Sequence, residues 1–174
     1  MPSFDTARLH LRPWNCDDVD ALHALWTNPD VRRWLWDDVV ISKDRAEETV
    51  VEAIREADES GIGMWCISRQ HAPGLIGFCG FRHFGEEKHV ELIYGLLPDH
   101  WGRGLAAEAA QSILNFGFGA GLFDRVYGRT DVPNRASARV LEKLGMQFDG
   151  RMLDGGLELV SYSLLRSART KPGS

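Results

Sequence analysis

The sequence predicts an α/β fold in which a mixed, mostly antiparallel central sheet carries helices on both faces. Helical segments come early in the chain, three β-rich segments joined by short turns follow, and helices then alternate with strands to the end. The 174 residues are enough for a domain with a substantial core. We therefore expect a single domain over residues 6–168 and a disordered tail over 169–174.

One strand and three helices are predicted in the first third of the chain. ARLHLRPW alternates Leu9 and Leu11 with polar residues, as a strand with one buried face does. Polar residues at 15–18 can cap the helix VDALHALW, and NPDVRRWLW places a proline in the first turn of a second short helix. A third helix begins at a cap, Ser42, and ends at Gly61. Its apolar stripe consists of Ala46, Val50, Ala53, Ile54 and Ala57.

Strands dominate the middle of the chain. The segments MWCISRQ, LIGFCGFRHF and HVELIYGLL are separated by the turns HAPG and GEEK, so they are expected to be antiparallel neighbours. The rest of the pattern is a helix over 103–118, the strand RVYGRT, a helix over 134–144 that ends at Gly145, and strands near QFDG and LELVSYSLL.

The composition argues against several classes of protein. A net charge of −5 disfavours a nucleic-acid binder, because such proteins need a concentrated basic face. No apolar run approaches the roughly 20 residues that span a bilayer, and MPSFDTARLHLRP lacks the features of a signal peptide. Cys16, Cys66 and Cys79 lack CxxC spacing, which is typical of reduced, mostly buried thiols in a cytoplasmic protein. His83 and His89 lack the spacing of a metal site, so we predict none.

The stretch PDHWGRGLAAEAAQ, residues 98–111, places two glycines between a predicted strand and a predicted helix. Glycine permits a positive φ and lets a ligand approach the backbone where a Cβ would block it. The first turn of a helix has free N–H groups and a partial positive charge, which together bind phosphate. Gly102 and Gly104, with Arg103 between them, therefore predict an anion site, unless the turn is only a tight connection chosen for packing.

Two other nucleotide-binding motifs do not fit this turn. A P-loop needs lysine and serine or threonine after its last glycine, where this chain has Leu105 and Ala106. A dinucleotide fingerprint needs an acidic residue about twenty positions on, at the end of the next strand. Asp124 instead precedes that strand, so the turn belongs to neither class.

Several stretches resemble the GNAT superfamily of acyl-CoA-dependent N-acetyltransferases, and within it the RimJ/RimL-like branch of ribosomal-protein N-terminal acetyltransferases. They are TARLHLRPW, NPDVRRWL, LIGFCGF, ELIYGLLPDHWGRGLAAEA and NRASARVLEKLGMQFDG, in the family's order over roughly residues 6 to 165. The resemblance implies the GNAT fold, acetyl-CoA (coenzyme A) as acyl donor and an amine as acceptor.

The resemblance also implies which residues hold coenzyme A. In the family, the loop that follows the central strand binds the pyrophosphate through backbone N–H groups. In this chain that loop consists of Trp101, Gly102, Arg103, Gly104, Leu105, Ala106 and Ala107. The strand before the loop hydrogen-bonds the pantetheine arm, which implies main-chain groups around Tyr94, Leu96 and Leu97.

A glycine interrupts this apolar strand at position 95. Such a glycine often marks a β-bulge or a close backbone approach, and a bulge frees an N–H group from the ladder. Aimed at a thioester carbonyl, a freed N–H would stabilise the tetrahedral oxyanion by ~2.7–4 kcal/mol. We therefore expect a bulge at or near Gly95.

The helix over 134–144 carries further candidates. Asn134 is a natural helix cap, and the resemblance adds a hydrogen bond from it to the cofactor, with Ser137 near the sulfur. Many family members protonate the departing thiolate with a tyrosine at the position of Leu141, and Ser137 is the replacement that this branch implies. Arg139 and Lys143 can meet the 3′-phosphate, although both also fit a solvated helix surface.

Acetyl transfer needs an unprotonated amine. An α-amino group with a pKa of ~7.7–8.0 is partly neutral at pH 7, whereas a lysine near ~10.4 is not. A base typically adds ~10²–10⁴-fold in rate. Glu91 is the candidate base or amine anchor, because burying it unpaired in an apolar strand would be costly and a wet cleft would avoid that cost. The alternative is a solvent-facing or salt-bridged strand carboxylate.

The acceptor is less defined than the donor. Trp34, Trp36 and Asp37–Asp38 lie where the family builds its acceptor site, and core packing explains the aromatic residues equally well. The resemblance favours a protein N-terminal α-amine. Nothing in the sequence points to a cysteine thiolate beside a base, so we expect the amine to attack the thioester directly. The alternatives are a small amine, such as an antibiotic, polyamine or amino acid derivative, or a non-catalytic acyl-CoA-binding module. Dimers are common in the family, so a homodimer is compatible with the sequence.

Overall fold

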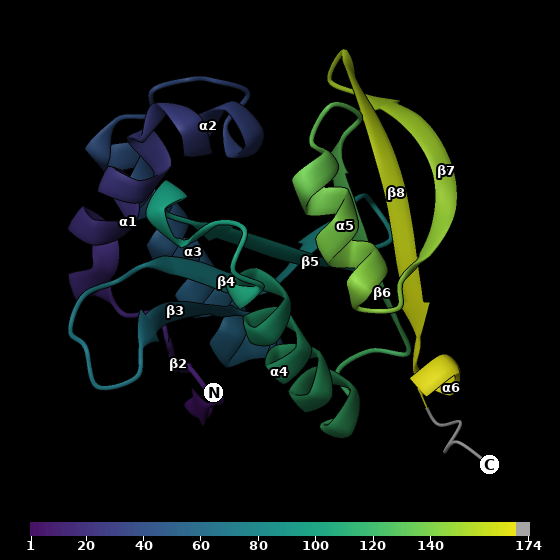
Figure 1. Cartoon of the computed structure of the whole chain (residues 1–174), viewed down its shortest axis with the longest axis horizontal. Helices are drawn as coiled ribbons and strands as arrows, with labels where there is room; N and C mark the ends of the chain where they lie inside the picture. The colour runs from purple at the N-terminus through teal and green to yellow at the C-terminus, as the bar shows by residue number, and fades with distance from the viewer. Residues whose placement is uncertain (170–174) are drawn as a thin grey trace.

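The computed structural model describes residues 1–169, and an eight-stranded sheet lies at their centre in the order β1-β2-β3-β4-β5-β6-β8-β7 (Figure 1). All neighbouring strands are antiparallel except β5 and β6. The mixed, mostly antiparallel sheet predicted from the sequence is confirmed. The strands are β1 (Phe4–Asp5), β2 (Leu9–Pro13), β3 (Met64–Arg69), β4 (Gly77–Phe84), β5 (His89–Leu96), β6 (Arg125–Asp131), β7 (Gln147–Asp154) and β8 (Leu157–Leu165).

Helices cover both faces of the sheet, as predicted. In Figure 1 α3 lies behind the sheet, whereas α4 and α5 lie in front of it. Helix α4 connects the parallel strands β5 and β6, and a 3₁₀ turn and the glycine turn lie between the end of β5 and the N-terminus of α4. The helices are α1 (Val19–Thr27), α2 (Pro29–Leu35), α3 (Lys43–Ser60), α4 (Leu105–Gly119), α5 (Arg135–Lys143) and α6 (Arg166–Arg169), with short 3₁₀ turns η1 (Cys16–Asp18) and η2 (Pro98–His100).

The predicted helix ends are formed by the expected residues. The Asn28 side chain accepts a hydrogen bond from the backbone N–H of Asp30, with Pro29 in the first turn of α2. The Ser42 hydroxyl caps α3, and Gly61 ends it in the left-handed region at φ 76°. Local sequence signals therefore fix where these helices begin and end.

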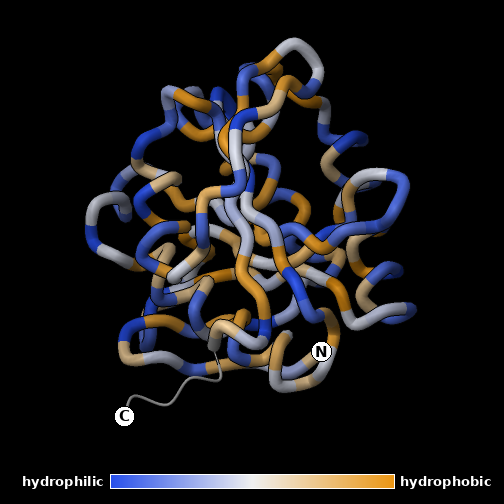
Figure 2. Tube along the Cα trace, turned by 90° about the vertical axis from the view of Figure 1, so that its right-hand side faces the viewer, coloured by the Kyte–Doolittle hydropathy of each residue, from blue (hydrophilic) through white to orange (hydrophobic). Residues whose placement is uncertain are grey.

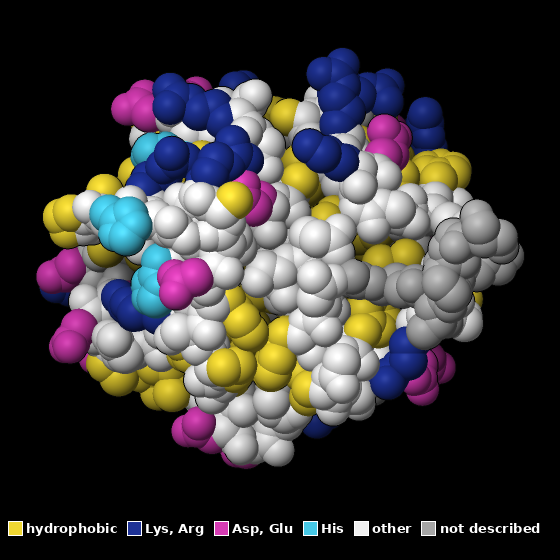
Figure 3. Space-filling view, turned by 60° about the horizontal axis from the view of Figure 1, so that its bottom comes forward, with side chains coloured by type: hydrophobic (Ala, Val, Ile, Leu, Met, Phe, Trp, Pro, Cys, Tyr) yellow, Lys and Arg dark blue, Asp and Glu magenta, His cyan; other side chains and the backbone are white. Residues whose placement is uncertain are grey.

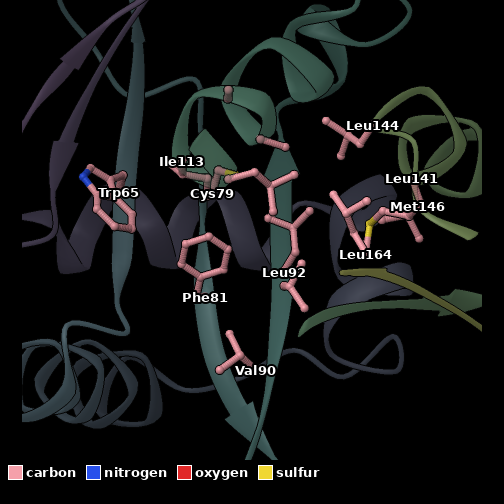
Figure 4. Close-up of a cluster of buried hydrophobic side chains, with 14 of the residues drawn as sticks. Trp65, Cys79, Phe81, Val90, Leu92, Ile113, Leu141, Leu144, Met146 and Leu164 are labelled. Atoms are coloured by element: carbon pink, nitrogen blue, oxygen red, sulfur yellow. The ribbon is translucent and has the colours of Figure 1, made fainter. Parts of the chain in front are cut away.

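Two hydrophobic cores lie on opposite faces of the sheet, because side chains alternate along each strand. Trp65 in β3 faces α4 and α5, whereas its neighbour Cys66 faces α1–α3. Figure 4 shows the α4 side, where Phe81, Leu92 and Ile113 meet. Hydrophobic residues lie mostly on the inner strands and helices, and hydrophilic residues in the outer turns (Figure 2).

Burial also explains the three cysteines. Cys66 and Cys79 are buried free thiols whose pKa is raised by burial, whereas Cys16 is exposed. No helix within residues 1–169 is long and apolar enough to cross a membrane.

The structure departs from the predictions in several places. Strand β1, which pairs with β2, was not expected and lies before residue 6, the predicted start of the domain. Helix α4 begins at Leu105 rather than 103, because Gly104 is still left-handed at φ 75°. Strand β7 continues beyond the predicted QFDG to Asp154 and pairs with β8 along its length. Helix α6 was not expected and includes Arg169, the first residue of the predicted tail. Residues 170–174, the rest of that tail, lie outside the described residues.

Candidate functional site

The two parallel strands at the centre of the sheet separate soon after they meet. Between β5 and β6, Glu91 and Tyr127 form the one ladder pair in the described part of the chain. Beyond that pair β5 continues to Leu96 and β6 to Asp131 without pairing to each other. The edges of the two strands therefore line an opening in the sheet, and the glycine turn follows at the end of β5.

The glycine turn has the conformation that the sequence predicts. Gly102 and Gly104 have φ angles of 71° and 75°, and Gly104 begins α4 without a side-chain cap. Within residues 1–169, no carbonyl or side chain accepts a hydrogen bond from the N–H groups of residues 102–107. Six consecutive backbone donors at a helix N-terminus are suited to a phosphate group.

Cations from two distant parts of the chain lie beside this turn. A Cβ added at Gly104 would be 3.7 Å from an Nη atom of Arg8 and 3.7 Å from the Nζ atom of Lys143. Arg8 also donates a hydrogen bond of 2.9 Å to the Arg103 carbonyl. In the described residues neither Arg103 nor Lys143 has an ion pair. Sequence analysis missed Arg8, which lies 95 residues before the turn.

Glu108, in the first turn of α4, holds Arg8 in place. Its Oε1 atom accepts hydrogen bonds from the Thr6 hydroxyl at 2.6 Å and the Arg8 N–H at 2.9 Å. Its Oε2 atom accepts from Arg8 Nε at 2.6 Å. Burial opposes ionisation of Glu108, but the hydrogen bonds from Thr6 and Arg8 outweigh it and hold the pKa of this carboxyl below its usual range.

Basic side chains are not spread evenly over the surface. On the face shown in Figure 3, most Lys and Arg side chains lie in two groups along the upper part. The net charge of the chain is −5, so a grouping of cations provides local attraction for an anion that the molecule as a whole does not.

Part of the β5 main chain is already engaged within the protein. The Leu97 N–H donates to the Ile76 carbonyl at 2.8 Å. The Trp101 indole N–H donates to the Leu96 carbonyl at 2.7 Å, and this carbonyl can accept a second hydrogen bond. Of the groups predicted to bind a pantetheine arm, the Leu97 N–H therefore has a partner.

The predicted bulge at Gly95 is wrong. The ladder between β4 and β5 runs without a register shift, from Gly77 opposite Leu96 to Phe84 opposite His89. A Cβ at Gly95 would lie 2.8 Å from Phe78 and 3.0 Å from Leu35 of α2. The glycine therefore makes room for the Phe78 ring and for Leu35 of α2. The separation of β5 from β6, rather than a bulge, exposes the strand edge.

Strand β5 and helix α5 meet across this opening. The Tyr94 hydroxyl donates to the Ser137 carbonyl at 3.1 Å and lies 2.9 Å from Ser137 Oγ. Burial raises the pKa of Tyr94 despite the Ser137 contact. Asn134 caps α5 by accepting from the Ser137 N–H at 3.1 Å, as predicted. The predicted positions of Tyr94, Asn134 and Ser137 thus come together, and the exposed Arg139 follows on the same helix.

Glu91 has the salt-bridged environment that sequence analysis left as an alternative. The side chain is buried in β5 and pairs with Arg82 of β4 and Arg129 of β6, each at 2.7 Å. A base function for Glu91 stays a prediction. A four-residue turn at 85–88 places Arg82 opposite Glu91, so this partner was derivable from the sequence.

An open cavity of about 390 Å³ lies on the α2 side of the opening. Trp34 lines it, whereas Trp36 packs against Trp26 with ring centroids 5.6 Å apart. Helix α2 and helix α5 face each other across the top of the molecule in Figure 1. The cavity is lined by Arg33, Trp34, Asp131, Val132, Pro133, Arg135, Leu157 and Glu158.

Asp131, at the end of β6, is a carboxylate in the cavity wall whose pKa is shifted. Burial raises the pKa of Asp131, and the neighbouring charge of Asp37 adds to the rise. Asp37 itself lies in the left-handed region at φ 52°. Neither residue has an ion pair among residues 1–169. The cavity wall carries a second carboxylate, Glu158, and two cations, Arg33 and Arg135.

Comparison with known proteins gives a consistent family. Residues 8–147 match the acetyltransferase (GNAT) domain family. The uncharacterized N-acetyltransferase YoaA of Bacillus subtilis (strain 168) is 32% identical over 153 residues, covering 86% of this chain and 85% of the relative. The spermidine N(1)-acetyltransferase of Escherichia coli (strain K12) is 23% identical over 153 residues, covering 88% of this chain and 79% of that protein.

Solved structures show the same fold. The RimL ribosomal L7/L12 α-N-protein acetyltransferase in complex with coenzyme A has a TM-score of 0.81 to this chain. The two are 21% identical, and the match covers 94% of this chain and 98% of the other.

Proposed function

This chain belongs to the GNAT family and is an N-acetyltransferase, and from that premise we propose that it transfers an acetyl group from acetyl-CoA to a primary amine by direct attack. The main support is the row of unpaired N–H groups at residues 102–107. These donors fit a diphosphate, because the positive φ of Gly102 and Gly104 leaves the backbone open to an anion.

The residues around the turn would hold the phosphate end of acetyl-CoA. The N–H groups of residues 102–107 bind the diphosphate, with Arg8, Arg103 and Lys143 as cations beside it. The exposed Trp101 side chain donates to the Leu96 carbonyl and keeps it oriented. When bound, acetyl-CoA supplies the activated thioester that an amine can attack.

The opening between β5 and β6 would hold the rest of the donor. The exposed edge of β5 at Tyr94 and Leu96 offers main-chain groups to the pantetheine arm. Asn134 retains its amide N–H₂ as a donor, because only its oxygen is used in capping. We place Arg139 near the 3′-phosphate, since it is exposed on α5, the helix that ends with Lys143.

The acceptor would enter through the cavity on the α2 side. Asp131 lines this cavity and attracts an ammonium group, which must lose its proton before it can attack. On the opposite face of the opening, the hydrogen-bonded hydroxyls of Ser137 and Tyr94 can protonate the departing thiolate. The amine and the leaving group thus have separate proton-transfer partners.

We infer that the acceptor is a protein N-terminal α-amine and that the chain is RimJ/RimL-like. The likeness to the L7/L12 acetyltransferase supports this assignment. An α-amine is also partly neutral near pH 7 without the help of a base. The cavity is open on one side, which suits the end of a chain.

A small polyamine is the second candidate acceptor. A relative is named as a spermidine acetyltransferase, and the two carboxylates in the cavity wall, Asp131 and Glu158, can each meet one positive charge of a polyamine. A cavity of about 390 Å³ is also within the range of small-molecule sites.

An acceptor panel separates the two. Release of the coenzyme A thiol is followed at pH 7.5 with acetyl-CoA and a peptide with a free N-terminus, the same peptide blocked at its N-terminus but carrying a lysine, or spermidine. We expect kcat/KM for the free N-terminus to exceed the other two at least about tenfold. A preference for spermidine would support the second candidate, and no thiol release with any amine would contradict both.

A further inference from the structure

The point where β5 and β6 begin to separate is marked by a buried charge cluster. Glu91, which forms the ladder pair with Tyr127, is only 3% exposed. Its Oε2 atom accepts from Arg82 Nε at 2.7 Å, and its Oε1 atom accepts from Arg129 Nε at 2.7 Å. Arg129 also donates through Nη2 to Oε2 at 3.3 Å. Both carboxylate oxygens are therefore occupied by guanidinium groups.

These three residues come from three adjacent strands. Arg82 of β4 lies directly opposite Glu91 in the ladder. Arg129 lies two residues after Tyr127 in β6, so it points to the same face of the sheet as Glu91. One carboxylate thus connects β4, β5 and β6 at the apex of the opening, where backbone pairing between β5 and β6 stops.

Arg129 is fixed from its other sides as well. It donates to Asp154 of β7 at 3.0 Å, and its guanidinium lies 4.1 Å from the centroid of the Phe84 ring. Burial lowers the pKa of Arg129, but the contacts with Glu91 and Asp154 outweigh this and raise it. The side chain therefore stays cationic, with little freedom to leave Glu91.

We propose that Glu91 is a positioning residue: the Arg82–Glu91–Arg129 clamp fixes how β5 and β6 separate and thereby aligns the acyl donor with the amine. A buried ion pair is weak evidence for stability, since desolvation offsets the attraction. Its bidentate geometry is directional, however, and can fix the orientation of β6 relative to β5. The inference rests on the proposed function, because alignment matters only if both substrates occupy the opening.

The clamp gives Glu91 a task that differs from a general base. Glu91 is 3% exposed and three guanidinium hydrogen bonds hold its carboxylate, so an amine in the opening has little access to its oxygens. Asp131 lies on the same face of β6, two residues beyond Arg129, and lines the acceptor cavity. It has no ion pair in the described residues, so a carboxylate is available to the ammonium without breaking the clamp.

The test compares Glu91→Gln, Arg129→Lys and the double variant with the wild type, using the acceptor panel above. Asp149→Asn is the matched control, because Asp149 pairs with Arg125 at the far end of the same strand β6. Each variant is characterised by its kcat, its KM for both substrates, its pH–rate profile, its affinity for coenzyme A by calorimetry and its Tm.

We expect Glu91→Gln and Arg129→Lys each to lower kcat at least about tenfold, because small misalignments of reacting groups are costly. The double variant should lose no more kcat than the more affected single variant, since both substitutions disrupt the same contact between Glu91 and Arg129. The acidic limb of the pH–rate profile should persist in all of them. Coenzyme A affinity should change less than about twofold, as the glycine turn is untouched, and Asp149→Asn should match the wild type.

Three results would overturn the clamp. The first is loss of the acidic limb in Glu91→Gln while Arg129→Lys stays as active as the wild type, which would make Glu91 the base. The second is losses that multiply in the double variant, and the third is full activity in both single variants. Should Glu91→Gln fail to fold, Arg129→Lys and Arg129→Gln decide the question. A wild type without acetyl transfer but with normal coenzyme A affinity would refute the proposed function instead.

Discussion

A methyl group at Gly104 should weaken coenzyme A binding far more than it weakens the fold. Gly104 has φ 75°, and left-handed backbone costs an L-residue roughly 1–2 kcal/mol. A Cβ there would be 3.7 Å from both Arg8 and Lys143, which is ordinary contact, so no clash adds to this cost. The methyl would, however, point into the space between these two cations, where the diphosphate is expected.

Gly121→Ala is the matched control for Gly104→Ala. Gly121 has φ 73°, and an added Cβ would lie 3.9 Å from the guanidinium of Arg166. It follows the C-terminal end of the 15-residue helix α4, about 22 Å away from Gly104. Both variants should therefore lose a similar amount of stability, about 2–8 °C in Tm for a domain of this size.

Calorimetric titration with coenzyme A separates the two variants. Losing one hydrogen bond to a charged group costs about 1.5–3 kcal/mol, so Kd should rise roughly 10- to 100-fold in Gly104→Ala. Gly121→Ala should keep the wild-type Kd. Equal Kd values in the two variants, with both still folded, would refute the placement of the diphosphate at the turn.

Three further variants test individual side chains. Glu108→Gln should raise the Kd for coenzyme A about threefold by releasing Arg8. Because the pKa of Glu108 is depressed in the fold, the variant should have a lower Tm than the wild type at pH 7. Scanning calorimetry should show this difference shrink as the pH falls below about 4. Asp131→Asn should change Tm in the opposite direction. Burial and Asp37 raise the pKa of Asp131, so its ionised form costs stability above an unfolded-state pKa near ~3.9. The variant should therefore have a higher Tm than the wild type at pH 7 and the same Tm at low pH. Its kcat/KM for cationic amines should fall about two- to fivefold in steady-state assays, and an unchanged value would remove Asp131 from the acceptor site. Ser137→Ala should lower kcat by no more than about tenfold at constant KM for acetyl-CoA, because a thiolate leaves with little need of an acid; a raised KM alone would assign Ser137 to binding.

Local signals in the sequence account for most of the fold. The cap at Ser42 and the stop at Gly61 define α3, and the turn at 85–88 defines the β4–β5 hairpin. The positive φ of Gly102 and Gly104 was likewise predicted, because a strand-to-helix turn of this kind requires it. Each of these features depends on residues close together in the chain.

The parts that could not be predicted depend on residues far apart. Arg8 reaches the turn only because β2 and α4 pack together, and its partner Glu108 is 100 residues away. Arg129 meets Glu91 through the parallel pairing of β5 with β6, which no short-range pattern specifies. The true reason for a glycine at position 95 is the approach of Leu35 from α2. This tertiary contact cannot be seen in the sequence, so a bulge was predicted instead.

The most direct test of the central claim is an amide NMR titration of the wild type with coenzyme A, alongside pantetheine, which lacks the diphosphate. Coenzyme A should shift the N–H resonances of residues 102–107 strongly, because these six donors gain an acceptor. Pantetheine should leave them nearly unchanged. Resonances of residues 102–107 that do not move with coenzyme A, while others elsewhere in the chain do, would contradict the account.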